Sequence, residues 1–249
     1  MEEPDNYFHL GGSYNFFCPK CKFGLLKFDV EKFIKVETKK SKNSEENIYG
    51  EKKFTEYIFN AILVCNNCKD IVSVNGYGDV AEYEEKIRIN PGPYEPEFDW
   101  MPVNVDRFYP LYFHPTIDLF KINNSCPKEI STLIRSSFNL FWSDKNASAN
   151  KIRIVVEKIL EKVDNKKHIK KLHQEIENSN NLTDEIKKHL LAIKWIGNSG
   201  SHKTLNIKTG DMIDGYKLLE HSINLIFSNY EELEKISEEI NQNKNVRKN

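Results

Sequence analysis

The spacing of the apolar residues changes once along the chain, and this change divides it into two parts. Up to about residue 90, short β-branched and aromatic runs such as Tyr57-Ile58-Phe59 are broken by polar turns and glycines, a pattern typical of strands. After Pro127 the apolar residues recur about every 3.6 positions, which is the period of an amphipathic helix. We therefore predict an α+β chain with a β-rich domain over residues 1–90 and an all-α bundle over residues 128–242.

Residues 91–127 combine several prolines with aromatic residues, among them Trp100 and Tyr109. Proline fixes φ and removes a backbone donor, so we expect an extended connector whose aromatic side chains pack on a neighbouring surface. The polar tail, residues 243–249, is expected to be flexible.

The helical half is expected to contain successive amphipathic helices. We place them at about residues 128–142, 147–163, 166–177, from the cap Thr183 to near Gly197, and 211–240.

Composition narrows the class of protein. The formal net charge is −1, so the chain as a whole is no polyelectrolyte suited to coating nucleic acid or anionic lipid. No apolar stretch approaches the ~20 residues that span a bilayer, and the first residues are acidic where a signal peptide would be basic. We therefore expect a cytoplasmic protein with no membrane association.

Four of the five cysteines form two Cys-x-x-Cys pairs, Cys18 with Cys21 and Cys65 with Cys68. Two such turns supply four thiolates, which is the ligand set of a closed, structural Zn²⁺ site. Two observations leave an alternative open: the 43 residues between the pairs exceed the spacing of compact zinc ribbons, and a single pair can act as a redox dithiol. Cys126 stands alone and is expected to be a buried free thiol.

Two polar sets interrupt the amphipathic pattern of the helical half. Asn198 and His202 lie four positions apart in a glycine-rich segment, so they share one side if the turn is helical. From local chemistry alone, a helix end capped by Gly and Asn is the favoured explanation. Arg153 and Glu157 occupy positions i and i+4 of an apolar run, as a structural ion pair or as part of a polar pocket.

The densest basic cluster follows the second expected helix and is a candidate for nucleic-acid binding or a solvated helix face. Its lysines are Lys166, Lys167, Lys170 and Lys171. The sequence lacks a phosphate-binding Gly-rich loop, a dinucleotide fingerprint, a His-Glu-x-x-His motif and a Gly-x-Ser-x-Gly elbow, so the corresponding enzyme classes are unsupported.

The order of these parts resembles the bacterial family named domain of unknown function four-one-four-five, which is widespread in restriction and phage-defence settings. The resemblance covers most of the chain and is best from about residue 105 to 235. Its marks are Arg153-x-x-x-Glu157 on one helix and Gly197-Asn198-x-x-x-His202 on a later one.

That family is similar to the HEPN helical domains, many of which dimerise and cut RNA without a metal. The resemblance implies that His202 moves protons and that Asn198 orients the substrate or the imidazole. Gly197, however, stands where active HEPN nucleases carry an arginine. Lys194 and Arg153 are the candidate substitutes for that cation. We therefore predict a zinc ribbon followed by a HEPN-like bundle that acts as a non-catalytic module in bacterial defence. It would form a homodimer through the helical domain and bind RNA or a defence protein. The alternative is a metal-independent ribonuclease that uses His202 as general acid and base.

Overall fold

In the computed structural model, the described residues are 7–8, 16–44, 54–88, 98–166, 169, 171–200, 206–228 and 230–243. The chain divides into two compact units, which are treated separately below. The sheet unit comprises residues 2–118 and 138–143, and the helical unit comprises residues 119–137 and 144–249. The mixed α+β class is as predicted.

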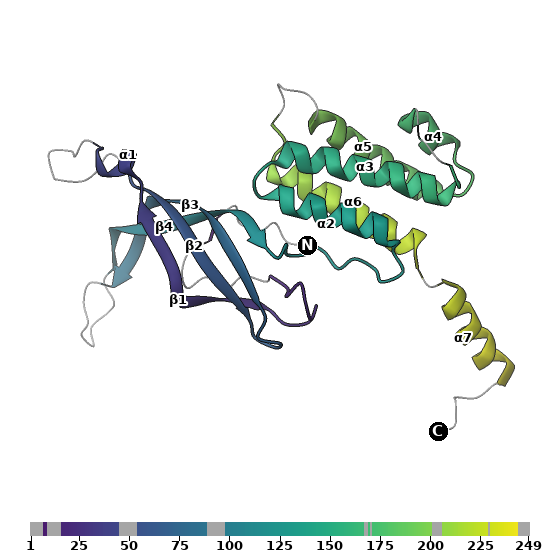
Figure 1. Ribbon diagram of the computed structural model, residues 1–249, viewed down its shortest axis with the longest axis horizontal. Coiled ribbons are helices and arrows are strands. Elements are labelled where there is room, and N and C mark those ends of the chain that lie inside the picture. The colour runs from purple at the N-terminus through teal and green to yellow at the C-terminus, as the bar shows by residue number, and fades with distance from the viewer. Residues whose placement is uncertain are drawn as a thin grey trace. The chain divides into compact units, whose positions relative to one another are not determined.

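The sheet unit is built on four antiparallel strands in the order in which they follow along the chain (Figure 1). They are β1 (Leu26–Glu37), β2 (Glu56–Cys65), β3 (Ile71–Arg88) and β4 (Phe98–His114), with the short helix α1 (Lys39–Lys42) after β1. Leu26 at the start of β1 pairs with Cys65 at the end of β2, and Val64 pairs with Ile71 at the start of β3. This register brings the two Cys-x-x-Cys turns to the same end of the sheet.

One face of the sheet carries the core of this unit. Alternate residues of β2 and β3 are buried there, and Phe59, Phe8 and Phe108 form an aromatic cluster with ring centroids 5.2 to 5.7 Å apart. The opposite face, called the open face below, carries large side chains that remain exposed. These are Ile34, Val36, Ile58, Tyr77 and Tyr112.

The segment expected to be a connector is largely part of the sheet. Residues 98–114 form β4, which pairs with β3 from Phe98 to His114. Two prolines, Pro102 and Pro110, lie within this strand. The sheet accepts them because β4 is an edge strand, where a missing backbone donor breaks no second ladder.

The helical unit contains six helices among its described residues. They are α2 (Lys128–Phe141), α3 (Lys145–Val163), α4 (Leu172–Asn178), α5 (Asp184–Gly200), α6 (Thr209–Ile226) and α7 (Tyr230–Asn243), the end of α2 being counted with the sheet unit. None of the described helices is long and apolar enough to cross a bilayer.

The first two predicted helices agree with α2 and α3, and the later ones differ in their bounds. The helix expected over 211–240 is two helices, because the chain leaves helical geometry at Phe227, where φ is −111° and ψ is 24°. Ser228, the polar residue that follows, favours turns over helix interiors. In contrast, α5 continues through Gly197 to Gly200, past its expected end.

A buried hydroxyl network joins three helices of this unit. Tyr216 of α6 is fully buried, and its hydroxyl lies 2.8 Å from Ser148 Oγ of α3 and 3.2 Å from Ser137 Oγ of α2. Ser148 also donates to the Ser137 carbonyl at 2.8 Å, and Ser137 donates to the Ile134 carbonyl at 2.7 Å. Burial raises the pKa of Tyr216, so the hydroxyl stays protonated.

We predict that Tyr216→Phe lowers the free energy of unfolding by about 1 kcal/mol, the usual net value of one buried hydrogen bond. The cost stays moderate because both serine hydroxyls keep a carbonyl partner. Urea denaturation followed by circular dichroism measures the change. The control Tyr112→Phe removes a hydroxyl from a residue that is 51% exposed and should alter stability by less than about 0.5 kcal/mol. Equal stability of the two variants would contradict the prediction.

Candidate functional site

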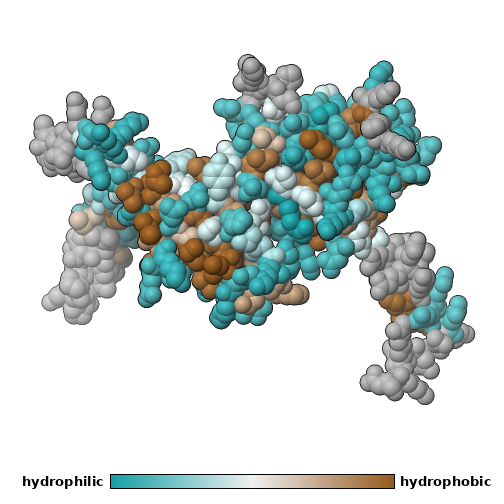
Figure 2. Space-filling model, in the orientation of Figure 1, coloured by the Kyte–Doolittle hydropathy of each residue, from teal (hydrophilic) through white to brown (hydrophobic). Residues whose placement is uncertain are grey.

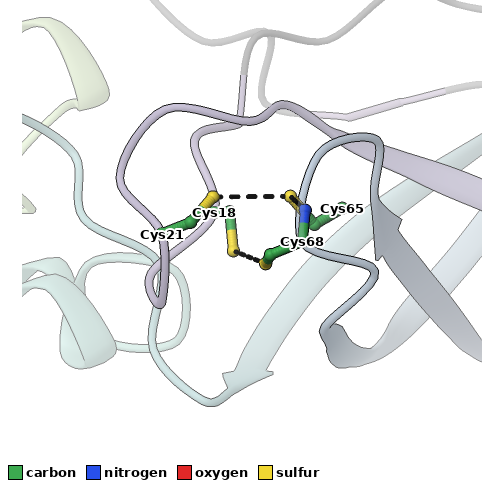
Figure 3. Close-up of side chains that lie close together, drawn as sticks. All are labelled: Cys18, Cys21, Cys65 and Cys68. Atoms are coloured by element: carbon green, nitrogen blue, oxygen red, sulfur yellow. Dashed lines mark hydrogen bonds between the residues drawn. The ribbon is translucent and has the colours of Figure 1, made fainter.

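The two Cys-x-x-Cys turns have the same backbone geometry. The N–H of Lys22 donates to the Cys18 carbonyl at 3.0 Å, and the N–H of Lys69 donates to the Cys65 carbonyl at 3.2 Å. Both lysines have positive φ, 63° and 61°, so each turn reverses the chain directly after its second cysteine. Equivalent turns at one end of the sheet aim four thiols at a common point (Figure 3).

The distances between the sulfurs fit a tetrahedral metal site. Cys18 Sγ lies 3.7 Å from Cys68 Sγ, and Cys21 Sγ lies 3.7 Å from Cys65 Sγ, while all four sulfurs lie within 4.8 Å of one another. A tetrahedron with metal–sulfur bonds of about 2.3 Å has edges of about 3.8 Å. A disulfide would need a separation of about 2.05 Å. Both close pairs join different turns, so the four cysteines form one site compatible with a metal ion.

Backbone N–H groups point at two of the sulfurs and favour their thiolate forms. The N–H groups of Phe23 and Gly24 lower the pKa of Cys21 to about 5. Burial opposes ionisation of Cys65, but the N–H groups of Cys68 and Asn67, both 3.4 Å from its Sγ, outweigh burial and lower its pKa. Such hydrogen bonds are the outer-shell contacts that orient metal-binding thiolates.

Ionisation of all four thiols requires a cation. The N–H of Asp70 favours the Cys68 thiolate, but burial and the neighbouring sulfurs outweigh it and raise its pKa to about 11. A bound dication would remove that repulsion and deprotonate the remaining thiol. The chemistry of the donor set therefore fits a metal.

Two further residues, which the sequence reasoning missed, lock the turns together. Asn66 accepts a hydrogen bond from the Leu25 N–H through Oδ1 and donates its own N–H to the Leu25 carbonyl, both at 2.9 Å. Gly24 has no room for a side chain, because a Cβ there would lie 2.4 Å from Cys65 Sγ. A glycine three residues after Cys21 was the available sequence signal.

Cys126 lies outside this cluster. It is buried, and burial raises its pKa to about 11, as expected for an unreactive thiol.

In the helical unit, α3 and α5 approach closely where α5 carries glycines. A Cβ on Gly197 would lie 2.4 Å from Arg153 Cβ, and one on Gly200 would lie 2.6 Å from the Asn146 carbonyl oxygen. Gly197, which stands at the position of the expected arginine, is therefore required by packing against Arg153. This contact explains why α5 stays helical through both glycines.

The structure brings some of the predicted polar residues to this seam between α3 and α5. Arg153 Nη2 bonds Glu157 Oε1 at 2.9 Å, and both side chains are partly buried, with 31% and 26% of their surface exposed. Asn198, next to Gly197, is partly buried. Lys194 is buried, with its Nζ 3.5 Å from the centroid of the Trp195 ring. His202 lies outside the described residues.

The predicted basic cluster is only partly described. Lys166 Nζ forms ion pairs with Glu175 and, at 3.5 Å, with Asp164, so its charge is balanced. Lys171 is exposed at the start of α4. Lys167 and Lys170 lie outside the described residues.

Comparison with known proteins gives two family matches. Residues 135–243 match the family described as Domain of unknown function (DUF4145), which confirms the predicted resemblance of the helical part. Residues 6–113 match a second family, Domain of unknown function (DUF8608). No curated protein and no solved structure matches the chain.

We predict that Gly24→Ala weakens metal retention, because the added methyl group must displace Cys65 Sγ or the Asn67 side chain. Elemental analysis after dialysis against a chelator measures the metal that remains per chain. Lys20→Ala is the matched control: it lies in the same turn, and its ion pair with Asp70 at 3.2 Å leaves the lysine 69% exposed. We expect loss of metal from Gly24→Ala at chelator concentrations that spare the control. Equal retention would contradict the close approach of Gly24 to the site.

Proposed function

We propose that this chain is a non-catalytic binding and assembly module, held at one end by a structural zinc ion, that recognises a protein partner in a bacterial defence system. The exposed apolar surface of its sheet supports this function most directly. The defence setting rests on the family resemblance of the helical part.

Zinc is the metal that suits the thiol cluster best. Four thiolates at tetrahedral spacing are its usual structural ligand set, and they leave no position for a catalytic water. The metal that the wild type and the Lys20→Ala control retain after dialysis is therefore expected to be one Zn²⁺ per chain. Zinc binding is coupled to folding of such sites, so its role here is to hold the turns at the ends of β1 and β2.

The open face is continuous across the strands. Val36, Ile58 and Tyr77 are direct neighbours on β1, β2 and β3, and they are 57%, 52% and 42% exposed. The neighbouring row of the same face, two residues along β2 and β3, contains Ile34 and Tyr112, which are 61% and 51% exposed. Hydrophobic residues reach the surface over the sheet in the space-filling view (Figure 2). A contiguous apolar patch of this kind marks an interaction surface.

The chemistry of this face favours a protein over a nucleic acid. Phosphate binding requires unpaired cations, whereas Arg107 at the border of the face donates two hydrogen bonds to Asp79, both at 2.7 Å. Asn60 and Asn75 supply polar groups between the apolar side chains. Exposed tyrosine, isoleucine and asparagine side chains match a partly apolar protein surface.

The described cations that were candidates for catalysis, and Lys166 from the predicted nucleic-acid-binding cluster, have partners within the helical unit. Arg153 bonds Glu157 and packs against Gly197, Lys194 lies over Trp195, and Lys166 is paired with two carboxylates. These contacts support the non-catalytic function. The proposed homodimer through the helical domain rests on the resemblance to HEPN domains.

One observation favours the second candidate function, a metal-independent ribonuclease. The Nε of Arg153 is buried and has no hydrogen-bond partner among the described residues. A buried guanidinium N–H without a partner could donate a hydrogen bond to a phosphate oxygen. In that function His202 would exchange protons with the ribose 2′-hydroxyl and the leaving oxygen.

We predict that the purified protein leaves a mixed RNA pool uncut and that His202→Ala behaves identically. Mapping of RNA ends in the presence of a chelator that spares the thiol site measures this. Cleavage by the wild type that disappears in a folded His202→Ala variant, leaving 2′,3′-cyclic phosphate ends, would overturn the non-catalytic function in favour of the ribonuclease.

The open face is tested by Ile58→Lys, which places a charge at its centre. Because an apolar contact does not tolerate an unpaired charge, we predict that crosslinking in the source cell recovers a defined protein partner with the wild type and loses it with the variant. Leu225→Lys is the control, since Leu225 is similarly exposed, at 43%, on α6. A partner that survives Ile58→Lys, or is lost equally from both variants, would exclude the open face as its binding site.

A further inference from the structure

Three potential metal ligands from α5 and α6 converge in the helical unit, and none of them is a cysteine. Glu185 and His189 are at positions i and i+4 of α5, so they share one face of that helix. His221 projects from α6, and its Nε2 lies 3.0 Å from Glu185 Oε1. The rings of His189 and His221 have centroids 5.4 Å apart. One ligand atom from each residue lies within 4.8 Å of the other two.

We propose that Glu185, His189 and His221 bind one divalent transition-metal ion. Imidazole nitrogen and carboxylate oxygen bind zinc, nickel and copper at about 2.0–2.2 Å, which places ligand atoms about 3.3–3.6 Å apart in a tetrahedron. The observed separations, from 3.0 Å to at most 4.8 Å, bracket that spacing. Small side-chain rotations therefore suffice to complete the site.

A simple ion pair explains only part of this arrangement. His221 and Glu185 can bond each other without a metal, but His189 would then have no role. The Nδ1 of His189 is buried and has no hydrogen-bond partner within the described part of the chain. On α4, His173 and Glu177 form a comparable pair at 3.6 Å, and no third ligand of the described residues joins them. The Nδ1 of His173 is likewise buried with no hydrogen-bond partner among the described residues, so the third converging ligand is what distinguishes the α5–α6 cluster from an ordinary surface pair.

This site differs in character from the thiol cluster. Two imidazoles and one carboxylate leave at least one coordination position for water or another ligand, unlike four thiolates. Glu185 and His221 are 59% and 52% exposed, so an ion there exchanges with solvent. Ligands from two helices make the bound metal a cross-link between α5 and α6. Thiolates are softer ligands than imidazole and carboxylate, so the two sites differ in metal preference and can be studied separately.

Nickel binding to the untagged, zinc-loaded full chain tests the proposal. Isothermal titration with Ni²⁺ measures affinity and stoichiometry, and elemental analysis counts nickel and zinc separately, so loss of zinc from the cysteines is not mistaken for a second site. The variants are His221→Ala and Glu185→Gln, both at exposed positions. His173→Ala is the matched control, because it removes an exposed histidine from a pair that lacks a third ligand.

We expect the wild type and His173→Ala to bind one nickel each, with zinc unchanged and with a thermal transition that rises as nickel is added. His221→Ala should weaken nickel binding by more than the about 10–100-fold that loss of an outer-shell partner costs, and Glu185→Gln should also weaken it. The proposal is overturned if the wild type binds no nickel, or if His221→Ala, folded by circular dichroism, binds as tightly as the control. A chain that lacks zinc but binds nickel in this pattern would contradict the structural zinc while supporting the α5–α6 site.

Discussion

The convergence of four cysteine thiols is the constraint on which the sheet unit depends. Two equivalent turns, each reversed at a lysine with positive φ, place the sulfurs 3.7 Å apart in two cross-turn pairs. Backbone donors stabilise some of the thiolates, while crowding raises the pKa of Cys68. A bound cation would offset that repulsion and allow all four sulfurs to be thiolates. The thiol cluster joins the start of β1 to the end of β2. The pairing register of these strands then determines which side chains lie on the buried face and which on the open face.

The helical unit depends on a different constraint, the absence of side chains on α5. Gly197 and Gly200 let α5 approach α3 at Arg153, Ala149 and Asn146. Close backbone packing of this kind requires glycine, since any Cβ would overlap the neighbouring helix. The position at which the resemblance to HEPN domains predicts an arginine is therefore occupied by a packing residue. This substitution links the sequence of the seam to the non-catalytic function that we propose.

Several charged side chains of the helical unit are paired within it. Arg153 bonds Glu157, Lys166 bonds Glu175, and Lys158 bonds Glu161 at 2.6 Å. Among the described residues, Arg153 Nε on α3 and His189 Nδ1 on α5 are two of the buried side-chain atoms that have no hydrogen-bond partner. A buried polar atom without a partner is costly unless something binds it, so these two atoms direct attention to the seam and to the α5–α6 cluster.

The sequence alone determined the α+β class, the helices α2 and α3, and the four cysteines that come together, because each depends on a local pattern: periodicity for the elements and two-residue spacing for the turns. Tertiary structure decided the rest. The prolines Pro102 and Pro110 predict a connector, yet they lie in β4. Proline is compatible with an edge strand, and only the topology shows which strand is at the edge. The break after α6 was hidden within an apolar period that runs on into α7. Glu185, His189 and His221 went unnoticed because His221 is distant in sequence, and only the packing of α5 beside α6 brings it to the other two.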